Sequence, residues 1–373
     1  MKFSIDKNIL LENIINVSKA LPTKNIIPIL NGIKFELTTK GLDLTASNSE
    51  LTIKTTIDKK EIKKIDEEGI IILQSKYIVD IIRKMPSDVI NFEVIDSLKI
   101  KIYTDNNQYN LNCLDPKEYP NPKLEFHKKP IVLKSELLKT IINQTCFAIS
   151  NQELRPLLTG VNLKINGNIL DCVATDSYRL AKKTFQLDEP IKDEIDIVIP
   201  GKNLIELDKI MNDTEESIEL HIFNNKVLFK YQNLIFQSNL LNGTYPNTNN
   251  LIPTEFEIII KNNIKEFHDA IDRAALLTQS KDKNIVKLKL EKNIMIIESY
   301  ASEIGKVEER IEVEVSEDAE IDISFSAKYM LEALRTIKEE EILILLNTSV
   351  KPIVIKSVDD ESLIQLILPI MTY

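Results

Sequence analysis

The residues best suited to chemistry lie in the stretch 173–181, where Asp176 and Arg179 stand three positions apart. A carboxylate beside an arginine could serve a metal-dependent nuclease, provided that two further carboxylates converge on Asp176 to hold Mg²⁺. A lone acid between Thr175 and Ser177 is equally typical of a turn. The Asp176/Arg179 cleft of a metal-dependent nuclease is therefore kept as an alternative function.

Other catalytic signatures are missing from the sequence. The eight glycines form neither G-x-G-x-x-G nor a phosphate loop, and Gly201-Lys202 lacks the glycine that a Walker A loop needs upstream. The three histidines stand in no H-E-x-x-H pattern, and the three cysteines have no C-x-x-C spacing. The sequence thus predicts no catalytic set, no metal site and no cofactor, which favours a protein that is not an enzyme.

The elements that position these residues occur three times in the sequence. An amphipathic segment carries a lysine at its second position, and Lys76, Lys202 and Lys328 follow one another at intervals of 126 residues. In the first copy the predicted buried face is Ile78, Ile81 and Met85, spaced i, i+3 and i+7. The three copies span 75–85, 201–211 and 327–337.

A second amphipathic helix is predicted upstream in each third, over 8–21, 135–148 and 262–277. Strand-like runs flank every helix, so each third reads strand, helix, strands, strand, helix, strands. The polar, proline-bearing stretches 115–130 and 242–254 separate the thirds. We predict an α+β fold of three repeated domains, each with two helices packed side by side on one face of antiparallel sheet. Their predicted boundaries are 1–127, 128–253 and 254–373.

Charge is distributed unevenly along the chain. The net charge is −10. The predicted helices with their first residues, counted over 7–20, 75–84, 134–148, 201–210, 262–277 and 326–338, nevertheless hold 14 Lys and Arg against 9 Asp and Glu. A cation in the first turn opposes the helix dipole, so the lysine at 76, 202 and 328 suggests an external anion such as a phosphate backbone. Helix propensity alone would also favour lysine. The start of the chain lacks a signal-peptide core, and no run is long enough to span a membrane, which predicts a cytoplasmic protein.

On these residues the chain resembles the bacterial sliding clamps, the β subunits of DNA polymerase III. The stretches that carry the resemblance are 27–33, 155–161, 174–181, 199–202, 245–247 and 368–370. The resemblance implies a head-to-tail homodimer that closes a ring of six domains around double-stranded DNA without reading its sequence. Helices line the hole, and the polymerase α subunit, the clamp loader and other clamp-motif proteins dock on a groove. Ring closure also removes the open sheet edges that three similar units would otherwise expose.

The resemblance assigns roles to particular residues. It implies DNA contacts at Lys24, Gln152 and Lys202, to which the repeat adds Lys76 and Lys328. The implied dimer interface brings Leu276 and Leu277 of one chain against the neighbourhood of Tyr109 of the other. The implied partner groove consists of Leu158, Thr175, Ser177, Tyr178, Arg179, Leu180, Pro246, Leu251, Tyr329, Val350, Pro352, Leu366, Ile367, Leu368, Pro369, Ile370 and Met371.

Two features of the sequence bear on this groove. The pattern of the tail 366–373 by itself favours a core strand, whereas the resemblance makes it a groove wall. Asn250 and Met371 stand where the family usually has arginine, and Ser177-Tyr178 replaces a usual Gly-His. A scaffold of repeats that binds only protein partners is a further alternative, which predicts that reversing the charge of Lys24, Lys76 and Lys202 has no effect.

Overall fold

The computed structural model describes residues 1–24, 27–212, 216–278, 284–316 and 319–371. The chain forms two compact units, one made of Met1–Leu138 with Glu206–Leu240 and the other of Lys139–Ile205 with Leu241–Tyr373. The second third of the chain contributes to both units. The three-domain boundaries at 127 and 253 stay a prediction.

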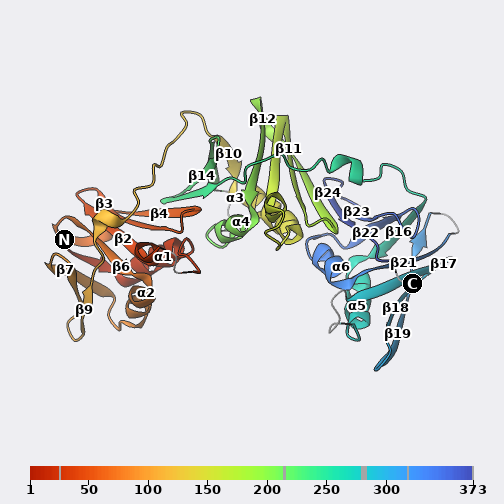
Figure 1. The fold of residues 1–373 in the computed structure, drawn as a ribbon, viewed down its shortest axis with the longest axis horizontal. Coiled ribbons are helices and arrows are strands. Elements are labelled where there is room, and N and C mark those ends of the chain that lie inside the picture. The colour runs from red at the N-terminus through yellow and green to blue at the C-terminus, as the bar shows by residue number, and fades with distance from the viewer. Residues whose placement is uncertain (25–26, 213–215, 279–283, 317–318, 372–373) are drawn as a thin grey trace. The chain divides into compact units, whose positions relative to one another are not determined.

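Each third has the order strand, helix, strands, helix, strands, as the sequence predicts (Figure 1), although the second has two long strands between its helices where the first and third have five. The first third contains β1 (Lys2–Asp6), α1 (Lys7–Ser18), β2 (Gly32–Thr38), β3 (Gly41–Ser47), β4 (Leu51–Asp58), β5 (Ile62–Glu67), β6 (Gly69–Gln74), α2 (Ser75–Lys84), β7 (Val89–Asp96), β8 (Lys99–Tyr103) and β9 (Gln108–Asn112). The second contains β10 (Ile131–Lys134), α3 (Ser135–Thr145), β11 (Gly160–Thr175), β12 (Arg179–Pro200), α4 (Gly201–Asp208), β13 (Ser217–Ile222), β14 (Lys226–Tyr231) and β15 (Leu234–Asn239). The third contains β16 (Ile258–Asn263), α5 (Ile264–Ala275), β17 (Ile285–Glu291), β18 (Ile294–Ala301), β19 (Gly305–Glu312), β20 (Glu314–Val315), β21 (Glu320–Ser326), α6 (Ala327–Leu334), β22 (Glu341–Leu346), β23 (Ile353–Ser357) and β24 (Leu363–Ile367).

The first unit holds two antiparallel sheets. One has the order β5-β1-β7-β8-β9, and the other has the order β10-β13-β14-β15-β4-β3-β2-β6. The pairing of β15 with β4, from Leu234↔Thr55 to Ser238↔Leu51, joins strands of the first and second thirds in one sheet. Helices α1 and α2 contact each other, and α1 contacts strands of both sheets. The helix pair therefore packs on antiparallel sheets, as the predicted α+β fold has it, and contacts both sheets of the unit.

The second unit repeats this plan. Its sheets have the orders β11-β12-β24-β23-β22-β16-β20 and β19-β18-β17-β21. Helices α5 and α6 lie side by side against both sheets (Figure 1). Their apolar faces enter one core through residues such as Phe267, Ile271 and Met330, all fully buried. Burial of such side chains contributes about 1.5–3 kcal/mol each.

The repeated helix that carries Lys76, Lys202 or Lys328 packs as expected in two of its three copies. Leu204, Leu207 and Met211 are buried in the second copy. In the first copy the prediction for Ile81 is wrong, because that side chain is only half-buried and Ile82 is buried instead. Positions i+3 and i+4 both lie near the same helix face, so spacing cannot separate them. No helix in the described part of the chain is long and apolar enough to cross a membrane.

Candidate functional site

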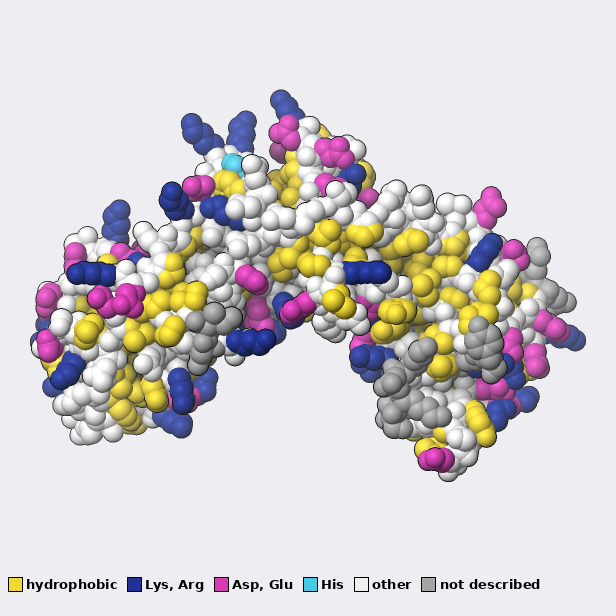
Figure 2. Space-filling view, viewed as in Figure 1, with side chains coloured by type: hydrophobic (Ala, Val, Ile, Leu, Met, Phe, Trp, Pro, Cys, Tyr) yellow, Lys and Arg dark blue, Asp and Glu magenta, His cyan; other side chains and the backbone are white. Residues whose placement is uncertain are grey.

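A cavity of about 650 Å³ opens in the second unit beside the turn between β11 and β12. Its floor consists of the buried side chains of Leu158, Leu180 and Leu366. In the space-filling view, hydrophobic side chains gather over α6 and the neighbouring strands β22 to β24 (Figure 2). The full lining is Arg155, Pro156, Leu157, Leu158, Thr175, Ser177, Arg179, Leu180, Pro246, Thr248, Leu251, Pro352, Leu366 and Leu368. We call this cavity the apolar groove.

The tail of the chain forms one wall of the apolar groove. Leu366 and Leu368 line it, whereas Ile367 is buried in the opposite core with 1% of its surface exposed. Successive side chains of a strand point to opposite faces, so Ile367 cannot share the groove with its neighbours. Val350, also assigned to the groove from sequence, is exposed and lines no described cavity.

Backbone hydrogen bonds fix the tail beyond the end of β24. The Leu368 N–H donates to the Tyr178 carbonyl at 2.9 Å, and the Ile370 N–H donates to the Ser324 carbonyl at 2.7 Å. Pro369 lies between these two anchors and has no N–H to leave unsatisfied. The tail is thus a strand up to Ile367, and Leu368 continues beyond the strand the wall that Leu366 begins.

A hydrogen-bonded turn positions the polar side of the apolar groove. The Asp176 carboxylate accepts from the backbone N–H of Tyr178 at 2.9 Å and of Arg179 at 3.0 Å. The Thr175 hydroxyl donates to the Arg179 carbonyl at 2.6 Å. Ser177 takes the left-handed conformation, with φ of 78°. The interpretation of Asp176 as a turn residue is therefore correct, since this side chain closes the turn.

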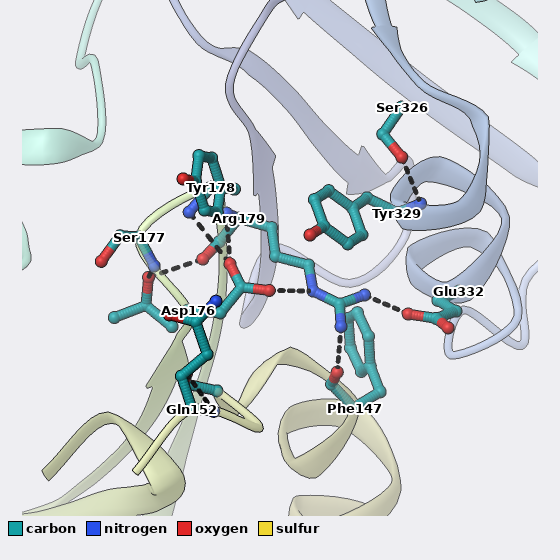
Figure 3. A network of polar contacts seen from close by, with 11 residues as sticks. Phe147, Gln152, Asp176, Ser177, Tyr178, Arg179, Ser326, Tyr329 and Glu332 are labelled. Atoms are coloured by element: carbon teal, nitrogen blue, oxygen red, sulfur yellow. Dashed lines mark hydrogen bonds and ion pairs between the residues drawn. The ribbon is translucent and has the colours of Figure 1, made fainter. Parts of the chain in front are cut away.

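Arg179 is the centre of a polar network that Figure 3 shows. Its guanidinium donates to the Asp176 carboxylate at 3.0 Å, to the Phe147 carbonyl at 2.6 Å and to the Glu332 carboxylate. The guanidinium also lies 4.4 Å from the ring centroid of Tyr329 and 5.2 Å from that of Phe147. Only 7% of Arg179 is exposed. A buried guanidinium with two carboxylates, a carbonyl and two rings is held rigidly in place.

This network removes the nuclease alternative. Asp176 is bonded to the turn and to Arg179, and Glu332 also binds Arg179. Within the described ranges, no three His, Cys, Asp or Glu side chains come together in a way that could hold a metal ion. The expectation that further carboxylates converge on Asp176 is wrong at this turn.

A second cavity of about 660 Å³ lies beyond Leu368, which lines both cavities. The pKa of the Tyr329 phenol there is raised, mainly by burial. Tyr178 and Met371 are 61% and 59% exposed and stand at its edge. Its lining is Tyr178, Asn284, Ser326, Lys328, Tyr329, Leu368, Pro369, Ile370 and Met371. We call this space the tail cavity.

The two cavities together hold most of the residues that the sequence assigned to a partner groove, and the apolar groove holds four that it did not. Arg155, Pro156, Leu157 and Thr248 were not assigned to it. The Arg155 guanidinium donates to the Ser177 hydroxyl at 3.1 Å, which ties the two sides of the apolar groove. The stretch 155–161 supports the resemblance, so nearness in sequence to Leu158 was the signal that could have added the first three.

The residues assigned to DNA are on the surface of their own units. Lys24, Lys76, Gln152 and Lys202 are exposed. Lys76 and Lys202 occupy the first turns of α2 and α4, as predicted. Lys328, in the first turn of α6, is exposed and lines the tail cavity.

Of the residues assigned to a dimer interface, one lies on an edge strand and two follow a helix. Tyr109 belongs to the edge strand β9 and is 38% exposed. Leu276 follows α5 and is 61% exposed, whereas Leu277 is half-buried. A large exposed leucine and an exposed tyrosine on an edge strand are typical of surfaces that pack against a partner.

Comparisons with known proteins agree along the whole chain. Three family models match: the N-terminal domain of the DNA polymerase III beta subunit over residues 1–123, the central domain over 132–247 and the C-terminal domain over 249–371. The curated beta sliding clamp of Bacillus subtilis is 42% identical over 379 residues and is covered completely, as is this chain.

Solved structures give the same result. The DNA polymerase sliding clamp of Bacillus subtilis matches with a TM-score of 0.96 at 42% identity, and the DNA polymerase III beta chain of Streptococcus pneumoniae matches with 0.96 at 33%. Each match covers 100% of both chains. The fold is thus the α+β clamp fold of repeated helix pairs and antiparallel sheets. The chain belongs to the DNA polymerase III beta subunit family, the bacterial sliding clamps.

Proposed function

We propose that two copies of this chain close head to tail into a ring around double-stranded DNA and tether the replicative polymerase and other partners through the apolar groove and the tail cavity. As a sliding clamp the chain is a processivity factor without a reaction of its own. The cytoplasm, where DNA is replicated in bacteria, is the proposed location.

The observation that carries the ring is the pattern of strand pairing. The last strand of the second third, β15, pairs with β4 of the first, and the last strand of the third, β24, pairs with β12 of the second. By this pattern the last strand of the first third, β9, should pair with β19 of another copy, because β19 holds in the third third the place that β4 holds in the first. Both β9 and β19 are edge strands among the described residues. A second copy would complete both pairings and leave neither edge open.

Side chains at these two edges support the same pairing. Tyr109 is on β9, Tyr300 is on β18 beside β19, and Ile304 directly precedes β19; all three are exposed. Two heterologous patches that each contain apolar side chains close a ring when the rotation between copies allows it.

The DNA contacts are proposed from charge and exposure. Lys24, Lys76 and Lys202 are exposed and form no ion pair within the described part of the chain. Such lysines can neutralise phosphates without reading bases, so replacing any one of them should reduce the salt dependence of DNA binding. Gln152 and Lys328 complete the proposed set.

The docking of partners is proposed from the two cavities. An apolar floor with a few fixed polar groups is the usual character of a site for a short peptide. Pro246, Leu251 and Pro352 line the apolar groove, and Pro369 and Ile370 line the tail cavity. The polymerase α subunit and the clamp loader are the proposed ligands.

Solution X-ray scattering on an absolute scale tests the ring first, because it reports mass and shape together. The expected particle has twice the mass of the 42.7 kDa chain and a distance distribution with a central hole. With the clamp loader from its own cell, the protein should be retained on nicked circular DNA and released when that DNA is linearised. A monomer, or equal retention on both DNAs, would contradict the proposal.

A charge-reversal variant separates a clamp from a protein-only scaffold. Lys24→Glu, Lys76→Glu and Lys202→Glu together should abolish retention on DNA while peptide binding in the groove persists. The matched control reverses Lys59, Lys60 and Lys63, which are exposed on the first unit, and should be retained normally. Unchanged retention of the first variant would support the scaffold.

A further inference from the structure

The chain that leads from β9 to β10 is fastened to one face of β13. Ile218 and Leu220 are buried core residues, so Glu219 and His221 lie on the opposite face of this strand. Residues 123–127 pack on that face, and we call them the strap. The strap and β13 both belong to the first unit.

His127 and Phe126 hold one end of the strap. The His127 N–H donates to Nδ1 of the buried His221 ring at 2.8 Å. The His127 ring stacks on Phe223 with ring centroids 4.3 Å apart, and its Nε2 lies 2.7 Å from the Ile222 carbonyl oxygen. The Phe126 ring contacts His221 edge to face at 5.2 Å. This end of the strap is thus centred on His221.

Lys226 of β14 holds the other end. Its Nζ donates to the Lys123 carbonyl at 3.0 Å and lies 3.7 Å from the Glu125 carboxylate. This end contains no histidine, the side chain whose charge most often changes between about pH 5 and 8. A change of pH in that range therefore acts on the strap at the His221 end.

The two neighbours of the His221 ring fix where its proton lies. Nδ1 accepts from the His127 N–H and so carries no hydrogen in the neutral ring. Nε2 lies 3.3 Å from the Glu219 carboxylate, which can only accept, and so carries the hydrogen. A second proton must enter at Nδ1, where it would face the His127 N–H. Two donors cannot bond to each other, so protonation removes the acceptor on which the strap depends.

Charged groups from three elements surround His221. Glu219 lies beside it on β13, Lys230 of β14 donates to Glu219 at 2.9 Å, and the His127 ring centroid lies 6.1 Å from that of His221. β10 contributes the uncharged Val132 opposite Glu219. The ion pair at the other end of the strap adds no net charge.

These surroundings determine the direction in which pH acts. Burial lowers the pKa of His221 below its ordinary value of 6.5 and outweighs Glu219, which raises it. The hydrogen bond from Lys230 lowers the pKa of the Glu219 carboxyl, so Glu219 stays ionised while His221 titrates. Below pH 6.5 the folded state therefore binds fewer protons than the unfolded state. The stability that the strap bond contributes is complete above that pH and is lost as the pH falls through the lowered pKa.

We propose that His221 is a proton-sensitive latch for the strap: the neutral ring holds the His127 N–H, and the protonated ring releases residues 123–127 from β13. Release brings the rings of Phe126 and Phe223 into contact with water and frees the chain just before β10. The latch lies within the first unit and does not depend on the ring of two copies.

Limited proteolysis tests the latch with a protease that cleaves after glutamate at both acid and neutral pH. At each pH its rate at the Glu125–Phe126 bond is divided by its rate on a synthetic peptide of residues 116–130. We expect this ratio to rise about fivefold or more from about pH 7.5 to about pH 5.5, because loss of one hydrogen bond shifts the equilibrium toward the open strap by about that factor. An unchanged ratio, or an equal rise after the exposed Glu291 of the second unit, would overturn the proposal.

Variants that remove one titrating ring at a time assign the effect. His221→Asn keeps an oxygen that accepts from the His127 N–H but takes up no proton in this range, so the ratio should stay low at both pH values. His127→Gln keeps a donor for the Ile222 carbonyl and should respond to pH as the unmodified protein does. A pH response in His221→Asn, or none in His127→Gln, would overturn the proposal.

Hydrogen exchange of the strap decides the question if His221→Asn fails to fold by thermal melting. Exchange of residues 123–127 in the unmodified protein, corrected for the intrinsic rate at each pH, should be faster at about pH 5.5 than at about pH 7.5. Unchanged protection would overturn the proposal. Lys226→Gln loosens the other end of the strap and should raise cleavage after Glu125 at both pH values. A pH response that Lys226→Gln abolishes would place the switch at the wrong end of the strap and contradict the latch.

Discussion

The turn between β3 and β4 and the turn between β11 and β12 have the same hydrogen bonds and backbone conformation but carry different side chains. In the first turn Asn48 accepts from the N–H groups of Glu50 at 3.0 Å and Leu51 at 2.8 Å. Ser47 donates to the Leu51 carbonyl at 3.2 Å, and Ser49 has φ of 78°. Asp176, Thr175 and Ser177 repeat each of these interactions in the second turn.

The neighbouring strand is also repeated. The Asn239 N–H donates to the Glu50 carbonyl at 2.8 Å, as the Leu368 N–H donates to the Tyr178 carbonyl at 2.9 Å. Beyond Asn239 the chain continues into the next third, whereas beyond Leu368 it runs along the tail cavity.

The difference lies in the side chains that the shared backbone carries. Leu51 is a buried core residue with 1% of its surface exposed. Its counterpart Arg179 binds Asp176 and Glu332 beside an apolar groove. The comparison teaches that two copies of a repeat can keep the same turn hydrogen bonds while one carries a buried leucine and the other an arginine network beside a cavity.

The largest effects are expected when each of the two counterpart residues, Arg179 and Leu51, is replaced by alanine. Arg179→Ala leaves two carboxylates without their cation, so we expect a loss of about 3 kcal/mol in the free energy of unfolding. The affinity for a labelled peptide with the clamp-binding motif of the polymerase α subunit should fall about a hundredfold. Leu51→Ala should cost about 2–4 kcal/mol through the cavity it creates and leave peptide affinity unchanged.

Chemical unfolding and fluorescence anisotropy measure the two effects. Both variants should remain dimers by analytical ultracentrifugation. A drop in peptide affinity for Leu51→Ala equal to that of Arg179→Ala would show that the groove responds to general destabilisation rather than to Arg179.

A smaller effect is expected from Glu332→Gln. The amide oxygen still accepts a hydrogen bond from Arg179, but the charge is lost, so unfolding should become easier by about 1 kcal/mol. The orientation of the guanidinium is retained by Asp176 and Phe147. Peptide affinity should therefore change about threefold at most. A loss as large as that of Arg179→Ala would mean that Glu332 itself contacts the partner.

Exchanging the turn residues tests how similar the two turns are. Asp176→Asn and Asn48→Asp each keep the oxygen that accepts from two backbone N–H groups. Asn48→Asp should change the free energy of unfolding by about 0.5 kcal/mol or less. Asp176→Asn also loses the charge facing Arg179 and should cost about 1 kcal/mol. Equal and large costs at both sites would show that the turns depend on charge rather than on acceptor geometry.

The smallest effect is expected at the two serines with positive φ. Ser49→Gly relieves the left-handed strain and adds chain entropy to the unfolded state, so the two contributions should cancel to within about 0.5 kcal/mol. Ser177→Gly also removes the acceptor of Arg155 and should cost a few tenths of a kcal/mol more. Differential scanning calorimetry of the pair measures this difference. A larger loss of unfolding free energy for Ser49→Gly than for Ser177→Gly would contradict this difference between the two turns.

The order of elements could be read from the sequence because each third repeats the same apolar periodicity. The lysine interval identified α2, α4 and α6, and strands flank each helix as predicted. The helix ends were less predictable: α3 ends at Thr145 and α6 at Leu334, short of the predicted ends at 148 and 337. Helix ends depend on local capping and on packing against neighbours, which periodicity does not report.

Most residues that line the two cavities were named from the sequence, but their geometry was not predictable. Resemblance located the Arg179 turn and the tail, and the structure shows Leu366 and Leu368 on the groove while Ile367 enters the core. The choice between adjacent residues depends on which face of β24 meets the sheet beneath it. A strand with apolar residues at every position does not reveal that face.

The sequence by itself determined three helix pairs, a turn at Asp176, and a chain with no catalytic motif, because periodicity and turn residues act over a few positions. Only the tertiary structure decided that β15 pairs with β4 and β24 with β12, that Glu332 and Phe147 hold Arg179, and that β10 is the end strand of its sheet among the described residues. Pairing across long sequence separations depends on complementary surfaces, and no local pattern in the chain specifies it.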